Sequence, residues 1–172
     1  MTSKSIKNKI SNFETGKVFR LEDLGLSRSE QNAAVVTLGR LVQEGEIERL
    51  SRGTYYKPKR TRFGVVGPSM EERFRDLLYD NDTPIGYLTG FYAFNLVGLT
   101  TQQSSTLGIG SNFPKRNGKR GMYTIRFVLQ KNPINRDNIE MLRILDCLKW
   151  IKKIPDTTTD RSYILLKAKV ND

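Results

Sequence analysis

One stretch, residues 27–58, constrains the fold of this chain most, because it combines a capped helix with a short basic hairpin. Ser27 and Glu30 have the S-x-x-E spacing of a capping box, in which the two side chains bond N–H groups left without partners at a helix start. We therefore expect a helix to begin near Arg28. Gly45 predicts its end, since glycine readily takes the left-handed conformation that closes many helices.

The predicted helix has two chemically different faces. Apolar residues recur at the spacing of a face that packs on a core; they are Ala34, Val35, Leu38, Leu41 and Val42. The opposite face carries Gln31, Asn32, Thr37, Arg40 and Gln43. Amide and guanidinium groups pair with adenine and guanine edges in a major groove, so this face is a candidate for base recognition. The alternative is an ordinary solvated face, since a capped helix before a hairpin occurs in many folds.

A short hairpin follows the helix. Residues 47–57 alternate in character around Arg52 and Gly53, which is typical of two strands joined by a tight turn. The hairpin would present Arg49 and Arg52 to solvent as a wing.

The residues before the helix complete a recognisable order. Ile6, Ile10 and Phe13 predict a first helix over residues 4–13. A short strand at Val18 and Phe19 and a one-turn helix over residues 21–24 should follow. Helix, strand, short helix, long helix and hairpin is the order of a winged helix-turn-helix domain, with residues 28–44 as its recognition helix.

Residues 38–58 match the pattern L-x-R-L-V-x-x-G-x-I-x-R-L-x-R-G-x-Y-x-x-P. Together with residues 16–25, GKVFRLEDLG, this stretch resembles the N-terminal domain of the AbiEi-type antitoxin family and of its transcriptional-regulator relatives. Residues 95–102, NLVGLTTQ, resemble the second domain of that family, so the similarity covers most of the chain. The resemblance implies a winged helix DNA-binding domain that represses its own operon. It also implies a second domain that counteracts a nucleotidyltransferase-like toxin encoded by the adjacent gene.

The expected DNA contacts fall in two groups. Those on the recognition helix are Arg28, Gln31, Asn32, Thr37 and Arg40, and those on the wing are Arg49 and Arg52. Gln31 and Asn32 are the expected base readers, because recognition helices usually present their N-terminal residues to base edges. The wing arginines fit phosphate or minor-groove contacts. For Arg40 two roles stay open, a phosphate contact and an ion pair with Glu44 at i+4.

The domain boundary is predicted after the wing. Residues 57–63, KPKRTRF, read as a basic connector, and VVGPS follows as a linker. We therefore expect a DNA-binding domain over residues 1–60, a linker over residues 61–68 and a second domain over residues 69–172. The predicted fold class is α+β, with a smaller sheet in the second domain. The connector's cations would extend the DNA footprint or simply be solvated; they are Lys57, Lys59, Arg60 and Arg62.

The second domain is predicted to mix helices and strands. Ser69 is a candidate cap for a helix over residues 70–80, and the apolar residues 87–99 fit a buried helix. Strands are expected over residues 105–110 and 122–131, and a further helix over residues 137–151. The last stretch, from residue 160, reads as a short helix or strand.

The formal net charge of +11 favours a polyanionic partner. Residues 1–60 carry 12 basic and 7 acidic side chains, and residues 61–172 carry 17 and 11, so both halves are positive. Residues 112–121 are a predicted basic loop around an Asn117-Gly118 turn, with Lys115, Arg116, Lys119 and Arg120. Contact with nucleic acid, contact with an acidic partner and no specific role are equally compatible with it.

The composition argues against an enzyme. The chain has no histidine, which removes the usual zinc and His-based catalytic sites, and its one cysteine, Cys147, lies in a helical pattern typical of a core. The only dense acidic group is Glu71, Glu72, Asp76, Asp80 and Asp82, which reads as a solvated helix face more readily than as a metal site. We expect no cofactor and no metal.

The leading hypothesis is a DNA-binding repressor that binds double-stranded DNA of its own promoter and is also an antitoxin. The alternatives are a module that mainly neutralises a toxin and an RNA-binding protein. The sequence shows neither an apolar run long enough to span a bilayer nor a signal peptide, so we expect a cytoplasmic protein. Its oligomeric state is open.

Overall fold

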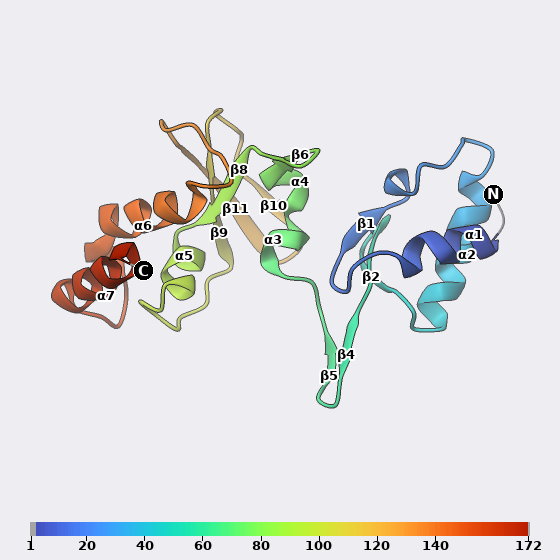
Figure 1. The fold of residues 1–172 in the computed structure, drawn as a ribbon, viewed down its shortest axis with the longest axis horizontal. Coiled ribbons are helices and arrows are strands. Elements are labelled where there is room, and N and C mark those ends of the chain that lie inside the picture. The colour runs from blue at the N-terminus through green and yellow to red at the C-terminus, as the bar shows by residue number, and fades with distance from the viewer. Residues whose placement is uncertain (1–2, 172) are drawn as a thin grey trace. The chain divides into compact units, whose positions relative to one another are not determined.

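The computed structural model describes residues 3–171, whose course is shown in Figure 1. Over these residues it contains seven α-helices, two short 3-10 helices and four small sheets. The predicted α+β class is therefore confirmed. The chain forms two compact units that divide between Phe74 and Arg75. Within residues 3–171, the helices lack the combined length and apolar character needed to cross a membrane.

The N-terminal unit contains all the elements predicted for residues 4–57. It begins with helix α1 (Ser3–Ser11), strand β1 (Val18–Arg20) and the 3-10 helix η1 (Glu22–Leu24). Helix α2 (Gln31–Gln43) and the strands β2 (Glu48–Ser51) and β3 (Thr54–Tyr56) follow. The unit is completed by β4 (Lys59–Thr61), β5 (Gly64–Val66) and the short helix α3 (Met70–Arg73).

Strand β3 is the centre of a three-stranded antiparallel sheet with the order β1-β3-β2. Tyr56 lies opposite Val18 on one side and opposite Glu48 on the other. Gly53, at φ +74°, makes the tight turn between β2 and β3. Strand β1, the first strand of the chain, is therefore an edge strand that pairs with β3 of the β2-β3 hairpin.

Helices α1 and α2 pack on this sheet through one shared core. Its buried members are Ile6, Ile10, Phe19, Leu24, Ala34, Leu38, Leu41 and Ile47. Burying one leucine or isoleucine side chain contributes roughly 1.5–3 kcal/mol, so these contacts are the main force that holds the helices in place. The Phe19 ring also packs between Phe13 and Tyr55, at centroid distances of 5.0 and 6.0 Å.

Helix α2 begins three residues later than the sequence predicts. The capping box forms only in part, because Glu30 Oε2 accepts a hydrogen bond from Ser27 N at 3.0 Å, whereas the Ser27 hydroxyl donates to the same carboxylate oxygen at 2.6 Å. Residues 28–30 are a turn instead of a first helical turn. The predicted end is confirmed: Gly45 has φ +70°, and Glu46 N donates to Leu41 O at 2.9 Å, as in a Schellman motif.

The buried face of α2 differs from the predicted one. Thr37 is only 6% exposed, and its hydroxyl donates to Ala33 O at 2.9 Å, whereas Val35 is 52% exposed. Ala34, Thr37, Leu38 and Leu41 have the i, i+3, i+4, i+7 spacing of one helical face, and Val35 lies outside it. The prediction that Val35 is a core residue is wrong, and so is the prediction of Thr37 on the exposed face.

Strands β4 and β5 form a separate antiparallel ribbon over much of the predicted linker. Lys59 lies opposite Val66 and Thr61 opposite Gly64, so Arg62 and Phe63 make the turn. All six strand residues are exposed. Figure 1 shows the ribbon extending away from the three-stranded sheet.

Residues 69–73 also belong to the N-terminal unit. Ser69 caps α3 as predicted, since its hydroxyl accepts a hydrogen bond from Glu72 N at 3.1 Å. Glu72 Oε1 in turn accepts from Val18 N at 3.0 Å, which joins α3 to β1. The single helix predicted over residues 70–80 is instead two short helices, one in each unit.

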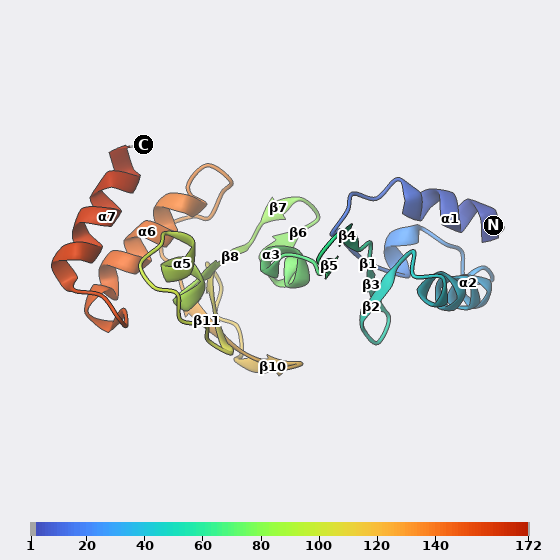
Figure 2. The same ribbon diagram turned by 90° about the horizontal axis from the view of Figure 1, so that it is seen from below.

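The C-terminal unit contains four strands of one sheet, a small hairpin and several helices. Its elements are α4 (Arg75–Leu78), β6 (Tyr79–Asp80), β7 (Thr83–Pro84), β8 (Gly86–Thr89), α5 (Phe91–Leu96), β9 (Thr106–Ser111), β10 (Gly118–Arg120), β11 (Tyr123–Leu129), α6 (Ile139–Lys149), η2 (Ile151–Lys153) and α7 (Thr159–Asn171). The sheet has the order β10-β11-β9-β8, and Figures 1 and 2 show α5, α6 and α7 gathered on the same side of it. The predicted helix over residues 137–151 is α6, and the last stretch is a helix.

Residues 86–89 form a strand where the sequence predicts the start of a helix over residues 87–99. All four residues of β8 are buried, so the strand lacks the alternation that normally identifies one. Only residues 91–96 of the predicted helix are helical, and Leu96, predicted as core, is 54% exposed.

The turn predicted at Asn117 and Gly118 in the basic loop is also wrong. Strands β9 and β11 run parallel, and β10 pairs with the outer edge of β11. The tight turn lies at Gly121 and Met122, with Gly121 at φ +58°, and not at Asn117 and Gly118. Asn117 instead accepts a hydrogen bond from Phe127 N at 2.9 Å through its side chain.

Asp146 on α6 ties this helix to the sheet through buried hydrogen bonds. Its Oδ2 accepts from the Tyr87 hydroxyl at 2.8 Å and from the Thr89 hydroxyl at 2.7 Å, both on β8. Gln130 Nε2 donates to the same Tyr87 oxygen at 2.8 Å. Burial is the main cause that raises the pKa of Tyr87 well above its usual value, so the phenol stays protonated and donates to Asp146.

Candidate nucleic-acid interface

The exposed face of α2 is the first part of the candidate interface. Asn32, Val36 and Arg40 follow one another at intervals of four residues, and all three are exposed. Val36 is 74% exposed, and a Cβ atom at Gly39 would meet nothing within 4 Å. The face thus combines an amide, a guanidinium and small apolar groups, a combination that suits adenine edges and thymine methyl groups.

The two predicted base readers differ in exposure. Asn32 is exposed, whereas Gln31, the first residue of α2, is half-buried. Arg28 is exposed in the turn that precedes the helix. Thr37 is buried and is withdrawn as a candidate DNA contact. Asn32 is therefore the amide best placed to reach a groove.

Arg40 is held in the structural role that the sequence left open. Its Nε lies 3.5 Å from Glu44 Oε1, and its Nη2 donates to the Ser3 hydroxyl at 2.7 Å. An exposed pair of this spacing contributes only about 0.2–0.5 kcal/mol, so a phosphate oxygen can replace the carboxylate at little cost. The phosphate role of Arg40 stays a prediction.

The hairpin of β2 and β3 is the second part of the interface. Arg49 is exposed on β2, and its Nε makes only a long contact of 3.4 Å with Ser51 O. Arg52 is exposed at the turn, and within residues 3–171 its guanidinium group has no hydrogen bond or ion pair with another residue. From residue 49 to residue 70 the sequence carries six basic side chains and no acidic one.

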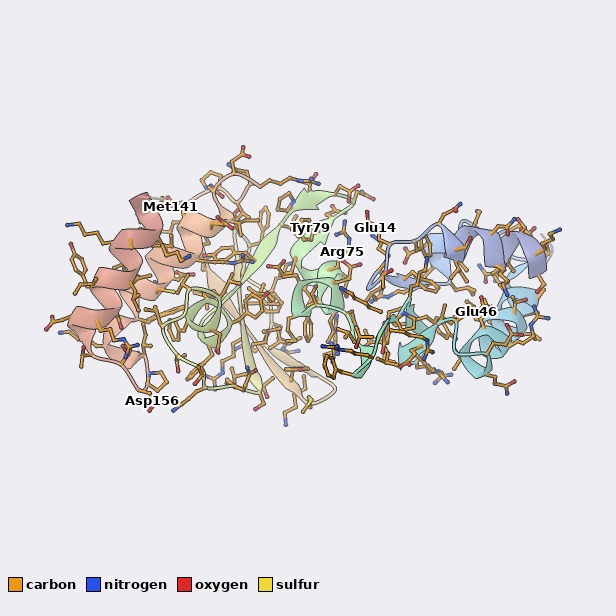
Figure 3. The ribbon with its side chains drawn as sticks, turned by 60° about the horizontal axis from the view of Figure 1, so that its bottom comes forward. Glu14, Glu46, Arg75, Tyr79, Met141 and Asp156 are labelled. Carbon is orange, nitrogen blue, oxygen red and sulfur yellow. The ribbon has the colours of Figure 1, made fainter. Side chains whose placement is uncertain are left out.

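The acidic residues at the end of α2 are all engaged. Glu44 pairs with Arg40, Lys7 Nζ lies 2.5 Å from Glu46 Oε1, and the Tyr56 hydroxyl donates to Glu48 at 2.8 Å. The hydrogen bond from Lys7 to Glu46 raises the pKa of Lys7 above its usual value. Glu46 is labelled in Figure 3. These contacts offset the carboxylates that would otherwise repel a phosphate backbone.

Two of the connector's four cations donate hydrogen bonds to backbone carbonyls of other elements. Lys57 Nζ donates to Ser11 O at 2.6 Å and to Phe13 O at 2.8 Å, where it stabilises the carbonyl end of α1. Arg60 Nη2 donates to Gly45 O at 2.5 Å, just beyond α2. Lys59 and Arg62 are exposed on the ribbon.

The basic loop predicted in the second domain does not form one free cluster. Arg120 makes a two-point ion pair with Asp76, at 2.6 and 2.8 Å, which ties β10 to α4. Lys115 Nζ lies 5.6 Å from the centre of the Phe127 ring. Arg116 and Lys119 are exposed. Arg120 is therefore a structural residue, and the loop offers fewer cations than the sequence predicts.

Asp82, one member of the acidic group predicted over residues 71–82, also has a structural contact. Asp82 pairs with Arg75 at 2.6 Å. The Arg75 guanidinium carbon lies 4.8 Å from the centre of the Tyr79 ring, and both of these residues are labelled in Figure 3. Within residues 3–171, no group of three or more His, Cys, Asp or Glu side chains is placed to hold a metal ion. Cys147 is buried, and burial is the main cause that raises the pKa of its thiol to about 12.

Residues 5–171 match a family of unknown function, DUF6088. The chain belongs to this family. A comparison with curated proteins finds no significant match.

The DUF6088 match includes both units and every candidate contact named above. Because the function of the family is unknown, the match assigns no role to any of these residues. The resemblance to AbiEi-type antitoxins therefore stays a prediction.

Sequence reasoning missed the apolar part of this surface. The sequence predictions include neither Val36 on α2 nor Phe63 at the ribbon turn. The Phe63 side chain is 86% exposed. For Phe63 a signal exists: residues 59–61 and 64–66 are short β-compatible segments separated by two residues, the spacing of a hairpin.

Proposed function

We propose that this DUF6088 protein is a DNA-binding transcriptional regulator and that its N-terminal unit is a winged helix-turn-helix domain. The observation that carries the proposal is the order α1, β1, η1, α2, β2, β3 together with a sheet in which β3 lies between β1 and β2. In such a domain α2 would be the recognition helix in a major groove, and the β2-β3 hairpin would be the wing.

Charge supports a polyanionic ligand for this unit. The wing arginines and the ribbon cations lie in a tract without any acidic residue, and the three glutamates after α2 are engaged with partners. Binding that rests on such contacts releases counterions from DNA, so its strength should fall steeply with salt.

The exposed face of α2 supplies the means of discrimination. Asn32 can pair bidentately with adenine, and Val36 can contact a thymine methyl group. Arg40 and Arg49 would contact phosphates on either side and fix the orientation of the helix. In this proposal Gln31 has a lesser role because it is half-buried.

The biological role follows from the family resemblance alone. AbiEi-type proteins repress their own operon, so the first DNA to test is the region upstream of this chain's own gene. Such a role would place the protein in the cytoplasm, without a cofactor and without catalytic turnover.

The decisive experiment is fluorescence anisotropy of the purified full chain on that upstream DNA, with scrambled DNA of equal length as control, across a salt series. The proposal expects tight binding that prefers the upstream DNA by at least about 1,000-fold. Equal, weak binding to both duplexes would contradict it. Stronger binding to the corresponding single-stranded or duplex RNA would favour an RNA-binding protein instead.

A second candidate function is capture of a protein partner by the C-terminal unit. Large apolar side chains are exposed on neighbouring helices, among them Met141 and Leu145 on α6 and Tyr163 and Ile164 on α7. Exposed apolar groups in such positions are typical of interaction surfaces. For an AbiEi-type antitoxin the partner would be a toxin encoded by the adjacent gene. Co-purification of that gene product, and its loss with Leu145→Glu, would support this function.

A further inference from the structure

The apolar residues of the ribbon formed by β4 and β5 are not explained by packing on a core. A hairpin that packs on a core hides every second side chain, whereas here all six strand residues are exposed. Val65 is 42% exposed, Val66 48% and Phe63 86%. A two-stranded ribbon is only marginally stable alone in water, and exposed apolar strands invite aggregation. Exposed apolar side chains of this kind mark the ribbon as a candidate surface for a ligand.

The turn of the ribbon is ordered by its own hydrogen bonds. The Thr61 hydroxyl donates to Gly64 O at 3.0 Å and accepts from Phe63 N at 3.2 Å. Gly64 has φ +119°, a conformation that favours glycine, and the Arg62 guanidinium carbon lies 4.6 Å from the centre of the Phe63 ring. The aromatic ring is thus presented at a fixed turn with a cation beside it.

The base of the ribbon is joined to the end of α2. Arg60 Nη2 donates to Gly45 O, the residue that closes α2, at 2.5 Å. Lys59 and Arg62 remain exposed, and no carboxylate occurs between residues 49 and 70. The ribbon is therefore a basic arm with an aromatic tip, attached beside the helix proposed to read DNA.

We infer that this ribbon is a second DNA-binding element, which lies along a groove beside the α2 site and inserts Phe63 between neighbouring base pairs. A two-stranded ribbon fits a DNA groove, and apolar wedges such as phenylalanine unstack base steps and bend the duplex. Lys59 and Arg62 would contact the flanking phosphates. This inference rests on the proposed DNA-binding function and adds to it a site and a deformation of the DNA.

The test uses the full chain and a duplex from the region upstream of its gene, with 2-aminopurine placed at successive positions. The fluorescence of this base rises when it is unstacked. Wild-type protein should raise the fluorescence at one base step, and Phe63→Ala should abolish that rise and weaken binding about tenfold. Lys59→Gln and Arg62→Gln should each lower the salt slope by about one.

Phe113→Ala is the matched control, since Phe113 is also an exposed phenylalanine, at 67%, but lies in the C-terminal unit. It should change neither signal, and thermal unfolding should show that both variants are folded. If wild-type protein binds DNA with no change in 2-aminopurine fluorescence, or if Phe63→Ala binds normally, the ribbon inference is overturned while DNA binding stands. If wild-type protein binds no duplex, both fail. Loss of binding to anionic phosphatidylserine vesicles in Phe63→Ala, with DNA binding intact, would assign the ribbon to a membrane surface and also overturn the inference.

Discussion

The Tyr87 ring lies directly against Gly110 on the neighbouring strand, where the two residues are register partners. A Cβ atom at position 110 would stand 2.9 Å from the Tyr87 hydroxyl oxygen and closer still to two ring carbons. The glycine leaves the space that the buried ring occupies. The ring in turn carries the hydroxyl that donates a hydrogen bond to Asp146. The attachment of α6 to the sheet therefore depends on a residue with no side chain.

The first prediction is that Gly110→Ala destabilises the C-terminal unit by about 1–3 kcal/mol, because the ring must move and strain its hydrogen bond to Asp146. Urea unfolding followed by circular dichroism measures the loss. Gly118→Ala is the control, since a Cβ atom there meets nothing within 4 Å. Equal effects of the two substitutions would show that loss of glycine flexibility, and not crowding, is responsible.

The second prediction concerns the wing. Arg49→Glu with Arg52→Glu should weaken binding to any DNA duplex and reduce the slope of log affinity against log salt by about two, because two phosphate contacts are lost. The control is Lys152→Glu with Lys153→Glu, which makes the same change in net charge at exposed residues of η2. An unchanged slope in the wing variant, or an equal change in the control, would exclude Arg49 and Arg52 as local phosphate contacts.

The third prediction separates two residues of α2. Asn32→Ala should reduce discrimination between upstream and scrambled DNA by about 1–3 kcal/mol, because an exposed amide that pairs with a base is lost. Thr37→Val should leave discrimination unchanged, since Thr37 is buried and its hydroxyl bonds to Ala33 O. Competition binding on both duplexes provides the measurement. Loss of discrimination with Thr37→Val would mean that α2 rotates about its axis when DNA binds and exposes Thr37.

The structure also shows why local pattern predicted the N-terminal unit better than the C-terminal one. Gly45 and Gly53 stand where the backbone needs a positive φ, so the end of α2 and the wing turn could be read directly. The start of α2 could not, because whether the Ser27 hydroxyl accepts from the helix or donates to Glu30 depends on the path of the turn. Thr37 lies at one edge of the buried face of α2, and Val35 lies just beyond the opposite edge. Periodicity alone places such edges too coarsely.

In the C-terminal unit, the wrong predictions have a tertiary cause. Residues 86–89 are apolar and fully buried, so a strand there has no alternation to distinguish it from a helix. The parallel pairing of β9 with β11 depends on contacts distant in sequence, and Asn117-Gly118, a good hairpin turn by composition, is used instead to begin the edge strand. The pairing of Arg120 with Asp76, 44 residues away, is invisible in the sequence for the same reason.

The fourth prediction tests that pair. Arg120→Ala and Asp76→Ala should each destabilise the C-terminal unit modestly, with a coupling free energy of about 0.5–1 kcal/mol in a double-mutant cycle, because the pair has two-point geometry but is partly exposed. Lys119→Ala, at an exposed neighbouring position, should show no coupling with Asp76→Ala. None of these substitutions should change binding to the upstream DNA; a large loss of DNA affinity with Arg120→Ala alone would return Arg120 to the interface.

The last prediction concerns Cys147 and pH. Burial raises the pKa of its thiol to about 12, from an ordinary value of 9.0, so the folded state keeps a proton that the unfolded chain releases. The free energy of unfolding should therefore fall as pH rises from about 9 towards 12, with this group contributing at most about 1.4 kcal/mol per pH unit. Cys147→Ala should show a shallower fall in urea unfolding than the wild type. At pH 8, a disulfide reagent such as DTNB should modify the native chain only as fast as the chain opens, and should modify it rapidly in urea. Rapid modification of the native chain would show that the thiol is accessible and that Cys147 on α6 is buried only transiently.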